Sequence, residues 1–417
     1  MKRYFFIWIA LLLLLLTACG EGEEKPVFDP SAPQADETPA SPSQGEAEPL
    51  PETAPLSETE TSPDPVESRV AALLARMSVE ERVGQIFFVR CPESGAAEDI
   101  ARYHLGGVLL FTRDYQDAGG NWLSERDLTE KIRAFQSAAA ESGGVPLFIG
   151  SDEEGGTVTR ASRNPNLFAQ KRRSPQQIFA AGGMDAVAQE TFDYNSTLLR
   201  YGINVNFAPV CDVSTYPGDF IYDRSFGQDA AATAEYVQTV VAQMNQCRVG
   251  GALQRMGAVL KHFPGYGSNA DTHTGIAIDN RPYELFETAD FLPFRAGIDA
   301  GAPFVLVSHN VVGCMDVSLP ASLSPAVHQI LRESLGFDGV VLTDDLAMDA
   351  VASYARDGSA AVLAVLAGND MLLSSDYLTQ IPQVCAAVED GTIPLETLDA
   401  ACARVLRAKI HLGLIGE

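Results

Sequence analysis

Positive charge is scarce in this 417-residue chain, which has 29 Lys and Arg residues against 55 Asp and Glu residues and a net charge of −26. Lys2 and Arg3 contribute +2, residues 20–68 contribute −12, and residues 69–417 contribute −16. A surface of this sign repels the phosphates of nucleic acids and of anionic lipids. We therefore expect no nucleic acid partner and no direct binding of the folded part to an anionic membrane surface.

Cysteine pairs with the spacing of zinc ribbons or redox motifs are absent. The chain has seven cysteines, and no two of them form a Cys-x-x-Cys pair. This scatter argues against both kinds of site. Outside the cytoplasm some of the thiols could form disulfides, but the sequence predicts no particular pairing.

No apolar run is long enough to span a membrane comfortably. Met1–Arg3 is a short positive start, and Tyr4–Leu16 is an apolar run typical of the core of a secretory signal. It ends in Leu-Thr-Ala-Cys19-Gly, which resembles a bacterial lipobox. The resemblance implies a signal peptide over 1–18, lipidation of Cys19, and an extracytoplasmic protein anchored to the cell membrane without crossing it. The alternative is an ordinary secreted protein with a chance cysteine.

Large apolar side chains are nearly missing from residues 19–66, which are rich in Pro, Glu, Ser, Thr and Ala. Residues 20–68 carry thirteen acidic residues and only Lys25 of opposite charge. Such a segment cannot bury enough surface to offset the entropy cost of ordering. We expect a disordered spacer over 19–66 that holds the folded part away from the lipid.

The remaining residues, 67–417, alternate short apolar runs with longer helical patterns. Eight runs are nearly continuous in apolar residues, as strands covered by helices on both faces require. They predict a (β/α)₈ TIM-type barrel with one catalytic domain, and a doubly wound open sheet is the main alternative. The predicted strands are 85–90, 107–112, 146–152, 203–210, 258–262, 304–309, 340–344 and 370–374.

Polar and titratable residues gather where these predicted strands end, which is where barrel enzymes build their sites. Six strands therefore point to one pocket. The residues at their ends are Asp152 to Gly156, Asp212, Lys261 with His262, Ser308 to Asn310, Asp344 with Asp345, and Ser374 with Ser375.

Histidine is rare as well, yet two of the six histidines fall in the segment KHFPGYGSNADTHTG at 261–275, with Lys261 and Asp271. A segment so rich in glycine and titratable groups is unlike core packing. By itself it fits a metal site, a proton-transfer loop or an anion clamp.

Two aspartates end the seventh predicted strand. A carboxylate at the end of a buried apolar strand is costly unless it is paired or functional. Asp344 leaves the strand first, so we assign it to the pocket. Asp345 is assigned to a helix cap or a supporting role.

Residues 261–275 resemble the signature of glycoside hydrolase family 3, specifically its single-domain β-N-acetylglucosaminidase (β-N-acetylhexosaminidase) branch. The resemblance covers essentially all of 67–417 in the right order. The other matching segments are Gly107–Arg113, Asp152–Gly156 with Arg160, Gly202–Asp212, Asp223–Gly227, and Thr343–Leu346 with Met348.

The resemblance implies a retaining exo-glycosidase that releases terminal β-linked N-acetylglucosamine from peptidoglycan-type or chitin-type oligosaccharides. It implies Asp344 as the nucleophile and His273 as the proton donor, and it implies no cofactor or metal. We expect a monomer that acts on a small carbohydrate. The implied substrate-binding residues are Asp152, Arg160, Asp212, Arg224, Lys261 and His262.

Asp271 and His273 are two positions apart, so an extended chain places both side chains on one side. Asp271 can then orient the imidazole and raise its pKa, which suits a group that donates a proton near neutral pH. A metal site built from His262, Asp271 and His273 and a merely structural Asp–His pair are the competing interpretations.

Tyr266 departs from the pattern of the branch, which commonly has His between the two glycines. The departure weakens any statement about the leaving-group side of the substrate. Other functions compatible with the sequence are a β-glucosidase, a phosphorylase that uses phosphate in place of water, and a non-catalytic sugar-binding lipoprotein.

Overall fold

A computed structural model describes residues 64–269, 275–352, 354–355 and 359–416 of the chain. The signal peptide, Cys19 and nearly all of the spacer lie outside these residues, as do Asp271 and His273. Two units are distinguished, 1–60 and 61–417, and only the second contains described residues.

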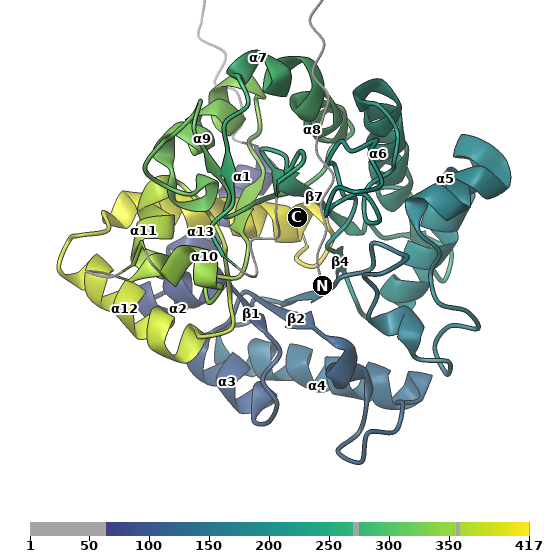
Figure 1. Ribbon diagram of the computed structural model, residues 1–417. Helices are drawn as coiled ribbons and strands as arrows, with labels where there is room; N and C mark the ends of the chain where they lie inside the picture. The colour runs from purple at the N-terminus through teal and green to yellow at the C-terminus, as the bar shows by residue number, and fades with distance from the viewer. Residues whose placement is uncertain (1–63, 270–274, 353, 356–358, 417) are drawn as a thin grey trace, which may run out of the picture. The chain divides into compact units, whose positions relative to one another are not determined.

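Eight parallel strands form one sheet in the order β11-β9-β7-β4-β3-β2-β1-β12 (Figure 1). Each coincides with one of the eight predicted runs. Their bounds are Phe87–Arg90 (β1), Gly107–Leu110 (β2), Phe148–Ser151 (β3), Val205–Asn206 (β4), Gly257–Phe263 (β7), Phe304–Val307 (β9), Val340–Thr343 (β11) and Leu372–Ser374 (β12). β4 is much shorter than its predicted run, in part because Pro209 has no N–H to donate to a neighbouring strand.

The sheet closes on itself. β1 pairs with β12 through Phe87 and Leu372. A parallel bridge joins Leu342 of β11 to Met371, next to β12, and the Thr343 N–H donates to the Met371 carbonyl at 3.1 Å. The predicted barrel is therefore confirmed, and the open sheet is wrong.

Helices surround the barrel (Figure 1). The sequence predicts helices over 66–77, 129–142, 230–246, 282–300, 325–335, 360–366 and 395–412. Most of the observed helices lie there, but α2, α3, α5, α10 and α12 were not predicted. In α5, Gly182 and Gly183 interrupt the helical dihedral angles and break the apolar period. The bounds are Pro65–Leu74 (α1), Val79–Gln85 (α2), Ala96–Tyr103 (α3), Glu125–Ser142 (α4), Pro175–Arg200 (α5), Ala230–Met244 (α6), Tyr283–Leu285 (α7), Phe291–Asp299 (α8), Pro325–Gln329 (α9), Asp349–Ala352 (α10), Ala360–Ala367 (α11), Tyr377–Glu389 (α12) and Leu395–His411 (α13).

Short turns and small sheets complete the structure. They are the 3₁₀ segments Thr112–Tyr115 (η1), Ala161–Arg163 (η2) and Ala321–Leu323 (η5), the π-helical segments Phe286–Asp290 (η4) and Ile330–Ser334 (η6), and the strand pairs Arg248–Val249 (β5) with Ala252–Leu253 (β6) and Ile278–Asp279 (β8) with Val311–Val312 (β10). The β8–β10 pair ties the chain after residue 274 to the segment that follows β9.

The barrel interior is filled by alternate residues of the strands, as the two-residue period of a strand requires. Phe88, Phe148 and Phe207 form edge or stacked ring contacts there. Gly150 makes room for these rings, because a Cβ at this position would lie 2.7 Å from Phe88. The interior is therefore packed, and a ligand site can form only above it, at the strand ends.

Candidate active site

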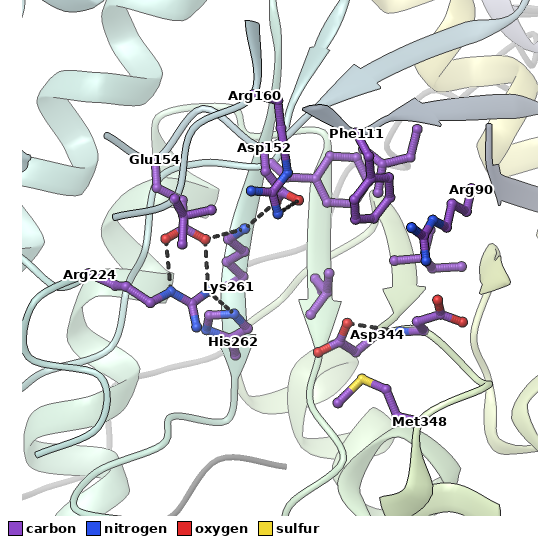
Figure 2. A pocket seen from close by; sticks show the side chains of 16 residues that line it. Arg90, Phe111, Asp152, Glu154, Arg160, Arg224, Lys261, His262, Asp344 and Met348 are labelled. Atoms are coloured by element: carbon purple, nitrogen blue, oxygen red, sulfur yellow. Dashed lines mark hydrogen bonds and ion pairs between the residues drawn. The ribbon is translucent and has the colours of Figure 1, made fainter. Parts of the chain in front are cut away.

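A central pocket of about 290 Å³ lies at the carboxyl ends of the strands (Figure 2). All predicted site residues in the described part line it except Asp212. The lining residues are Arg90, Leu109, Phe111, Asp152, Glu154, Val158, Arg160, Phe207, Arg224, Lys261, His262, Leu306, Asp344, Asp345, Met348 and Leu373. Residues from all eight strands or the loops after them thus meet in one place.

A network of ion pairs forms one side of the pocket (Figure 2). The Lys261 Nζ lies 2.9 Å from the Asp152 Oδ1 and 2.7 Å from the Glu154 Oε1. Arg224 donates two hydrogen bonds to the Glu154 carboxylate, at 2.9 and 2.8 Å. Arg160 approaches Asp152 more loosely, at 3.4 Å. The network therefore fixes five charged side chains that face the same cavity.

The charges in this network stabilise one another despite their burial. Burial opposes ionisation of Glu154, but the Arg224 and Lys261 cations hold the pKa of its carboxyl well below the usual range. Burial also opposes the charge of Lys261, and the carboxylates of Asp152 and Glu154 raise its pKa nevertheless. Both groups stay ionised at neutral pH and offer strong hydrogen bonds to a polar ligand.

Asp212 lies behind His262 and is not among the residues that line the pocket, although the resemblance implies a role in substrate binding. Its side chain is fully buried. One carboxylate oxygen lies 2.8 Å from the His262 Nδ1 and accepts the His262 N–H, while the other accepts the Tyr266 N–H at 2.7 Å. The carboxylate thus contacts the His262 ring and the main chain at His262 and Tyr266.

His262 is held on its other sides as well. Its Nε2 lies 3.0 Å from an Arg224 nitrogen, and the Tyr266 ring packs edge-on against it with centroids 5.0 Å apart. Tyr266 is 1% exposed. The tyrosine that departs from the family pattern is therefore part of the packing beneath the site. The peptide bond between Lys261 and His262 is cis.

The two aspartates after β11 have different surroundings. Asp344 lines the pocket, and its Oδ1 accepts the Asp345 N–H at 2.8 Å. The Asp345 carboxylate also borders the pocket, but it accepts hydrogen bonds from both the N–H and the hydroxyl of Ser375. It thus ties β11 to the loop after β12, which fits the supporting role predicted for it.

His309 is buried under this corner of the site. Its Nδ1 lies 2.7 Å from the Ser322 Oγ, and its Nε2 lies 3.1 Å from the Asp345 carbonyl oxygen. These contacts place His309 beneath the pocket, and it is not among the lining residues.

Sequence reasoning missed Arg90 and Phe111 as lining residues, and it gave Glu154, one of the strand-end residues, no role of its own. The Arg90 guanidinium lies over the Phe111 ring at 4.4 Å, and Arg160 approaches the same ring at 5.3 Å. Arg90 ends β1, so its position at a strand end was an available signal. Glu154 follows Asp152 in the same acidic turn, and only the tertiary structure distinguishes which of these acids face the pocket.

The third acid of that turn, Glu153, points away from the pocket. It accepts the N–H groups of Arg160 and Ala161 and the hydroxyl of Tyr194. Burial raises the pKa of the Glu153 carboxyl above its usual value. Because it fixes the main chain at Arg160, Glu153 sets the position of the Arg160 side chain in the pocket.

Metal ligation was one interpretation of the loop at 261–275. Among the residues that the structure describes, no group of three or more His, Cys, Asp or Glu side chains has the arrangement of a metal site. Two of the three residues in that interpretation, Asp271 and His273, lie outside the described part. The six described cysteines are free thiols.

The barrel with a carboxylate and an ion-pair network above its strand ends is an arrangement typical of glycoside hydrolases. Residues 78–408 match the family described as glycosyl hydrolase family 3, N terminal domain. The chain belongs to this family, and the protein is a glycoside hydrolase.

Particular relatives are similar over most of the chain. A β-hexosaminidase, LpqI of Mycobacterium tuberculosis, is 31% identical over 351 residues, which are 81% of this chain and 84% of the relative. The structure resembles a family 3 β-N-acetylglucosaminidase of Paenibacillus, with a TM-score of 0.72, 29% identity, and coverage of 82% of this chain and 64% of that one. It also resembles a β-N-acetylhexosaminidase of Beutenbergia cavernae, with a TM-score of 0.70, 31% identity, and coverage of 80% and 99%.

Within the described ranges, no helix combines the length and the apolar character needed to cross a membrane.

Proposed function

We propose that the protein is a retaining exo-β-N-acetylglucosaminidase. The observation that carries the proposal is that the Asp344 carboxylate and the Asp152–Lys261–Glu154–Arg224 network border the same pocket of about 290 Å³. A pocket at the lower limit of ordinary ligand sites, about 300 Å³, suits one terminal sugar better than a long chain. The names of the relatives, β-hexosaminidase and β-N-acetylglucosaminidase, support the choice of sugar.

In the first step, an Asp344 oxygen attacks the anomeric carbon while the bond to the leaving oxygen breaks. His273 gives its proton to that oxygen, and a covalent glycosyl-enzyme forms. In the second step, His273 takes a proton from water, whose oxygen bonds to the anomeric carbon and releases Asp344. Asp271 orients the imidazole in both steps.

The sugar is held by the network on the opposite side of the pocket. Asp152 accepts hydrogen bonds from sugar hydroxyls, while Lys261 and Arg160 donate to ring hydroxyls or to the N-acetyl carbonyl. Arg224 and His262 complete this set. Asp212 acts through His262 and does not contact the sugar. Residues 67–417 form the catalytic domain, and no metal or organic cofactor takes part.

The site of action in this proposal is outside the cytoplasm. Cleavage before Cys19 and lipidation of its thiol anchor the protein to the membrane, and residues 19–66 act as the spacer. Fragments of peptidoglycan or chitin-type oligosaccharides are the substrates, because both carry terminal β-linked N-acetylglucosamine. The protein acts as a monomer.

The test is hydrolysis of chromogenic β-N-acetylglucosaminide and β-glucoside, with and without phosphate, by the wild type and by Asp344→Ala. We expect the wild type to prefer the N-acetylglucosaminide, to release free sugar without phosphate, and to lose at least about a thousandfold in kcat in Asp344→Ala. A sugar phosphate as the product would identify a phosphorylase. Activity of Asp344→Ala equal to wild type would overturn the nucleophile assignment, and no turnover of any substrate would favour a sugar-binding protein.

The proton donor is tested separately by the leaving group. A nitrophenolate leaves without protonation, whereas the sugar alcohol of an unactivated disaccharide does not. His273→Ala should therefore lose far more kcat/KM on the disaccharide than on the nitrophenyl substrate. Equal losses on both would argue that His273 supports the loop and does not donate the proton.

A further inference from the structure

Arg281 binds two buried carboxylates in the segment that follows β7, and none of the three residues lines the central pocket. The Arg281 Nη1 and Nη2 donate to the two Asp290 oxygens at 2.9 and 3.2 Å, and its Nε donates to Asp279 at 2.9 Å. Asp279 is 3% exposed and Asp290 is 2% exposed. We call these three side chains the Arg281 cluster.

The Arg281 cluster contains more acid than base. Burial raises the pKa of the Asp290 carboxyl to about 6, the Arg281 guanidinium opposes that shift, and the neighbouring Asp212 and Asp279 add to it. Buried carboxylates without a cation are costly. The arrangement of the cluster therefore depends on the single positive charge of Arg281.

The turn that precedes residues 270–274 packs directly on this cluster. A Cβ on Gly267 would lie 2.5 Å from the Arg281 Cζ, and a Cβ on Gly265 would clash with the Asp290 carboxylate. The φ angles of Gly265 and Gly267 are +121° and +54°, which glycine adopts without strain. The close approach to the cluster thus accounts for both glycines of this turn.

The chain that follows residue 274 is joined to the same cluster. Asp279 belongs to β8, which pairs with β10 through Ile278 and Val311. Its carboxylate accepts the main-chain N–H of Arg281 at 2.9 Å in addition to the side-chain Nε. One guanidinium therefore connects the turn before residues 270–274 with the strand after them.

Asp271 and His273 lie outside the described residues, but in the sequence they fall between Gly267 and Asp279. Both of these flanking residues contact Arg281. A misplacement of about 1 Å at a reacting group can reduce a rate by roughly a hundredfold. A proton donor in this segment is therefore sensitive to the positions of the two flanking residues.

We infer that Arg281 is a positioning residue for proton transfer to the leaving group. Through Asp290 and Asp279 it fixes the chain on both sides of the segment that carries the proton donor. The inference rests on the proposed function, in which His273 protonates the leaving oxygen. Arg281 itself contacts neither the sugar nor the reacting atoms, so its loss slows the steps that need His273 more than the attack by Asp344.

The experiment uses Arg281→Lys, which keeps the positive charge but cannot form the paired hydrogen bonds to two carboxylates. For each protein, kcat/KM is measured on nitrophenyl β-N-acetylglucosaminide and on an unactivated disaccharide of β-linked N-acetylglucosamine. The ratio of the two constants does not depend on the fraction of folded protein, so a merely structural defect leaves it unchanged. We expect Arg281→Lys to lose roughly tenfold more on the disaccharide, in the same direction as His273→Ala.

Arg332→Lys is the matched control. Arg332 also binds a buried carboxylate, that of Asp370, but it does so at the amino ends of β11 and β12. The Arg332 side chain is 20% exposed and that of Arg281 is 26% exposed. Arg332→Lys should keep the wild-type ratio. Asp279→Asn retains the pair of Arg281 with Asp290 and should shift the ratio as Arg281→Lys does, so it remains informative if Arg281→Lys fails to fold.

The outcomes separate this inference from the proposed function. Wild-type ratios in both Arg281→Lys and Asp279→Asn, together with a selective loss in His273→Ala, would overturn the inference alone. Equal losses on both substrates in His273→Ala would overturn the proton-donor assignment and the inference with it. A wild type that hydrolyses neither substrate would overturn the proposed function as a whole.

Discussion

Glu154 binds Arg224 through both of its carboxylate oxygens, at 2.9 and 2.8 Å, and one of these oxygens also lies 2.7 Å from the Lys261 ammonium. The carboxylate is 1% exposed, so this pairing takes place away from water. Two cations that face the central pocket therefore depend on one buried acid. The resemblance to the family had assigned both cations a role but not this acid.

Glu154→Gln should lower both stability and activity. The amide cannot neutralise two buried cations, and removing one partner from a buried ion pair costs about 3 kcal/mol of unfolding free energy. We expect kcat/KM to fall at least about tenfold as Arg224 and Lys261 shift. Urea unfolding and steady-state kinetics measure the two effects.

The difference in stability between wild type and Glu154→Gln depends on pH, because the pKa of Glu154 is lowered in the folded protein. The folded-state pKa of Glu154 is held below the ordinary value of 4.5, so its contribution is complete above about pH 4.5 and declines as the pH falls further. Wild type and Glu154→Gln should converge in stability below that pH. Glu190→Gln is the control. The Glu190 side chain is 37% exposed and that of its partner Arg173 is 44% exposed, so this ion pair should contribute no more than about 1 kcal/mol to stability.

Asp212→Asn tests whether this acid acts through His262. In the wild type the carboxylate accepts hydrogen bonds from three donors. The NH2 group of the amide would face one of them, which leaves that buried donor without an acceptor and costs about 1–3 kcal/mol of unfolding free energy. We expect KM to rise and the ring resonances of His262 to shift in NMR spectra. Asp219→Asn in the same loop, where Ser214 donates to the carboxylate, should alter neither. Unchanged His262 resonances in Asp212→Asn would contradict the positioning role.

Tyr266→Ala should be strongly destabilising although the position departs from the family pattern. The ring is buried against His262 and Phe220, and deleting a buried aromatic ring costs about 3–5 kcal/mol. The matched control is Tyr216→Ala, because Tyr216 is 68% exposed and should change stability by less than about 0.5 kcal/mol. Similar unfolding midpoints for the two variants would show that Tyr266 does not support the site.

Lys409 enters the floor of the barrel from α13. It is fully buried, its Nζ donates to the Gln85 Oε1 at 2.6 Å, and it lies 5.0 Å from the centre of the Phe148 ring. Burial lowers the pKa of Lys409 to about 7 from the ordinary value of 10.5. The charged form is therefore unfavourable in the folded state, and this cost is absent above pH 10.5 and complete below pH 7.

Lys409→Met should gain stability relative to wild type as the pH falls from about 10 to 7.5, by roughly 1.4 kcal/mol per pH unit. The measurement is urea unfolding of both proteins across that range. Lys171→Met, at an exposed lysine, should show no such slope. A difference between Lys409→Met and wild type that does not vary with pH would mean that Lys409 keeps an ordinary pKa in the folded protein.

The positions of the eight strands could be predicted because a strand covered on both faces must be apolar along its whole length. Such a strand gives a continuous apolar run in the sequence. The position of α5 could not be predicted, because Gly182 and Gly183 break its apolar period. The Ser174 cap with Gln177 was the only local signal of this helix. The gathering of Asp152, Lys261 and Asp344 followed from parallel strands ending at one edge. Their roles came from the resemblance and, like those of Asp271 and His273, remain predictions.

By itself the sequence determined the barrel, the family, and most of the charged residues that face the pocket, because these depend on strand periodicity and on motifs contiguous along the chain. Only the tertiary structure decided which acids bind which cations. Asp152, Glu153 and Glu154 are consecutive and alike in chemistry, yet Glu153 supports the loop while Glu154 pairs with Arg224, seventy positions away. Asp212 likewise proved to hold His262 from behind. Such pairings depend on the direction of each side chain after the barrel closes, which no local pattern encodes.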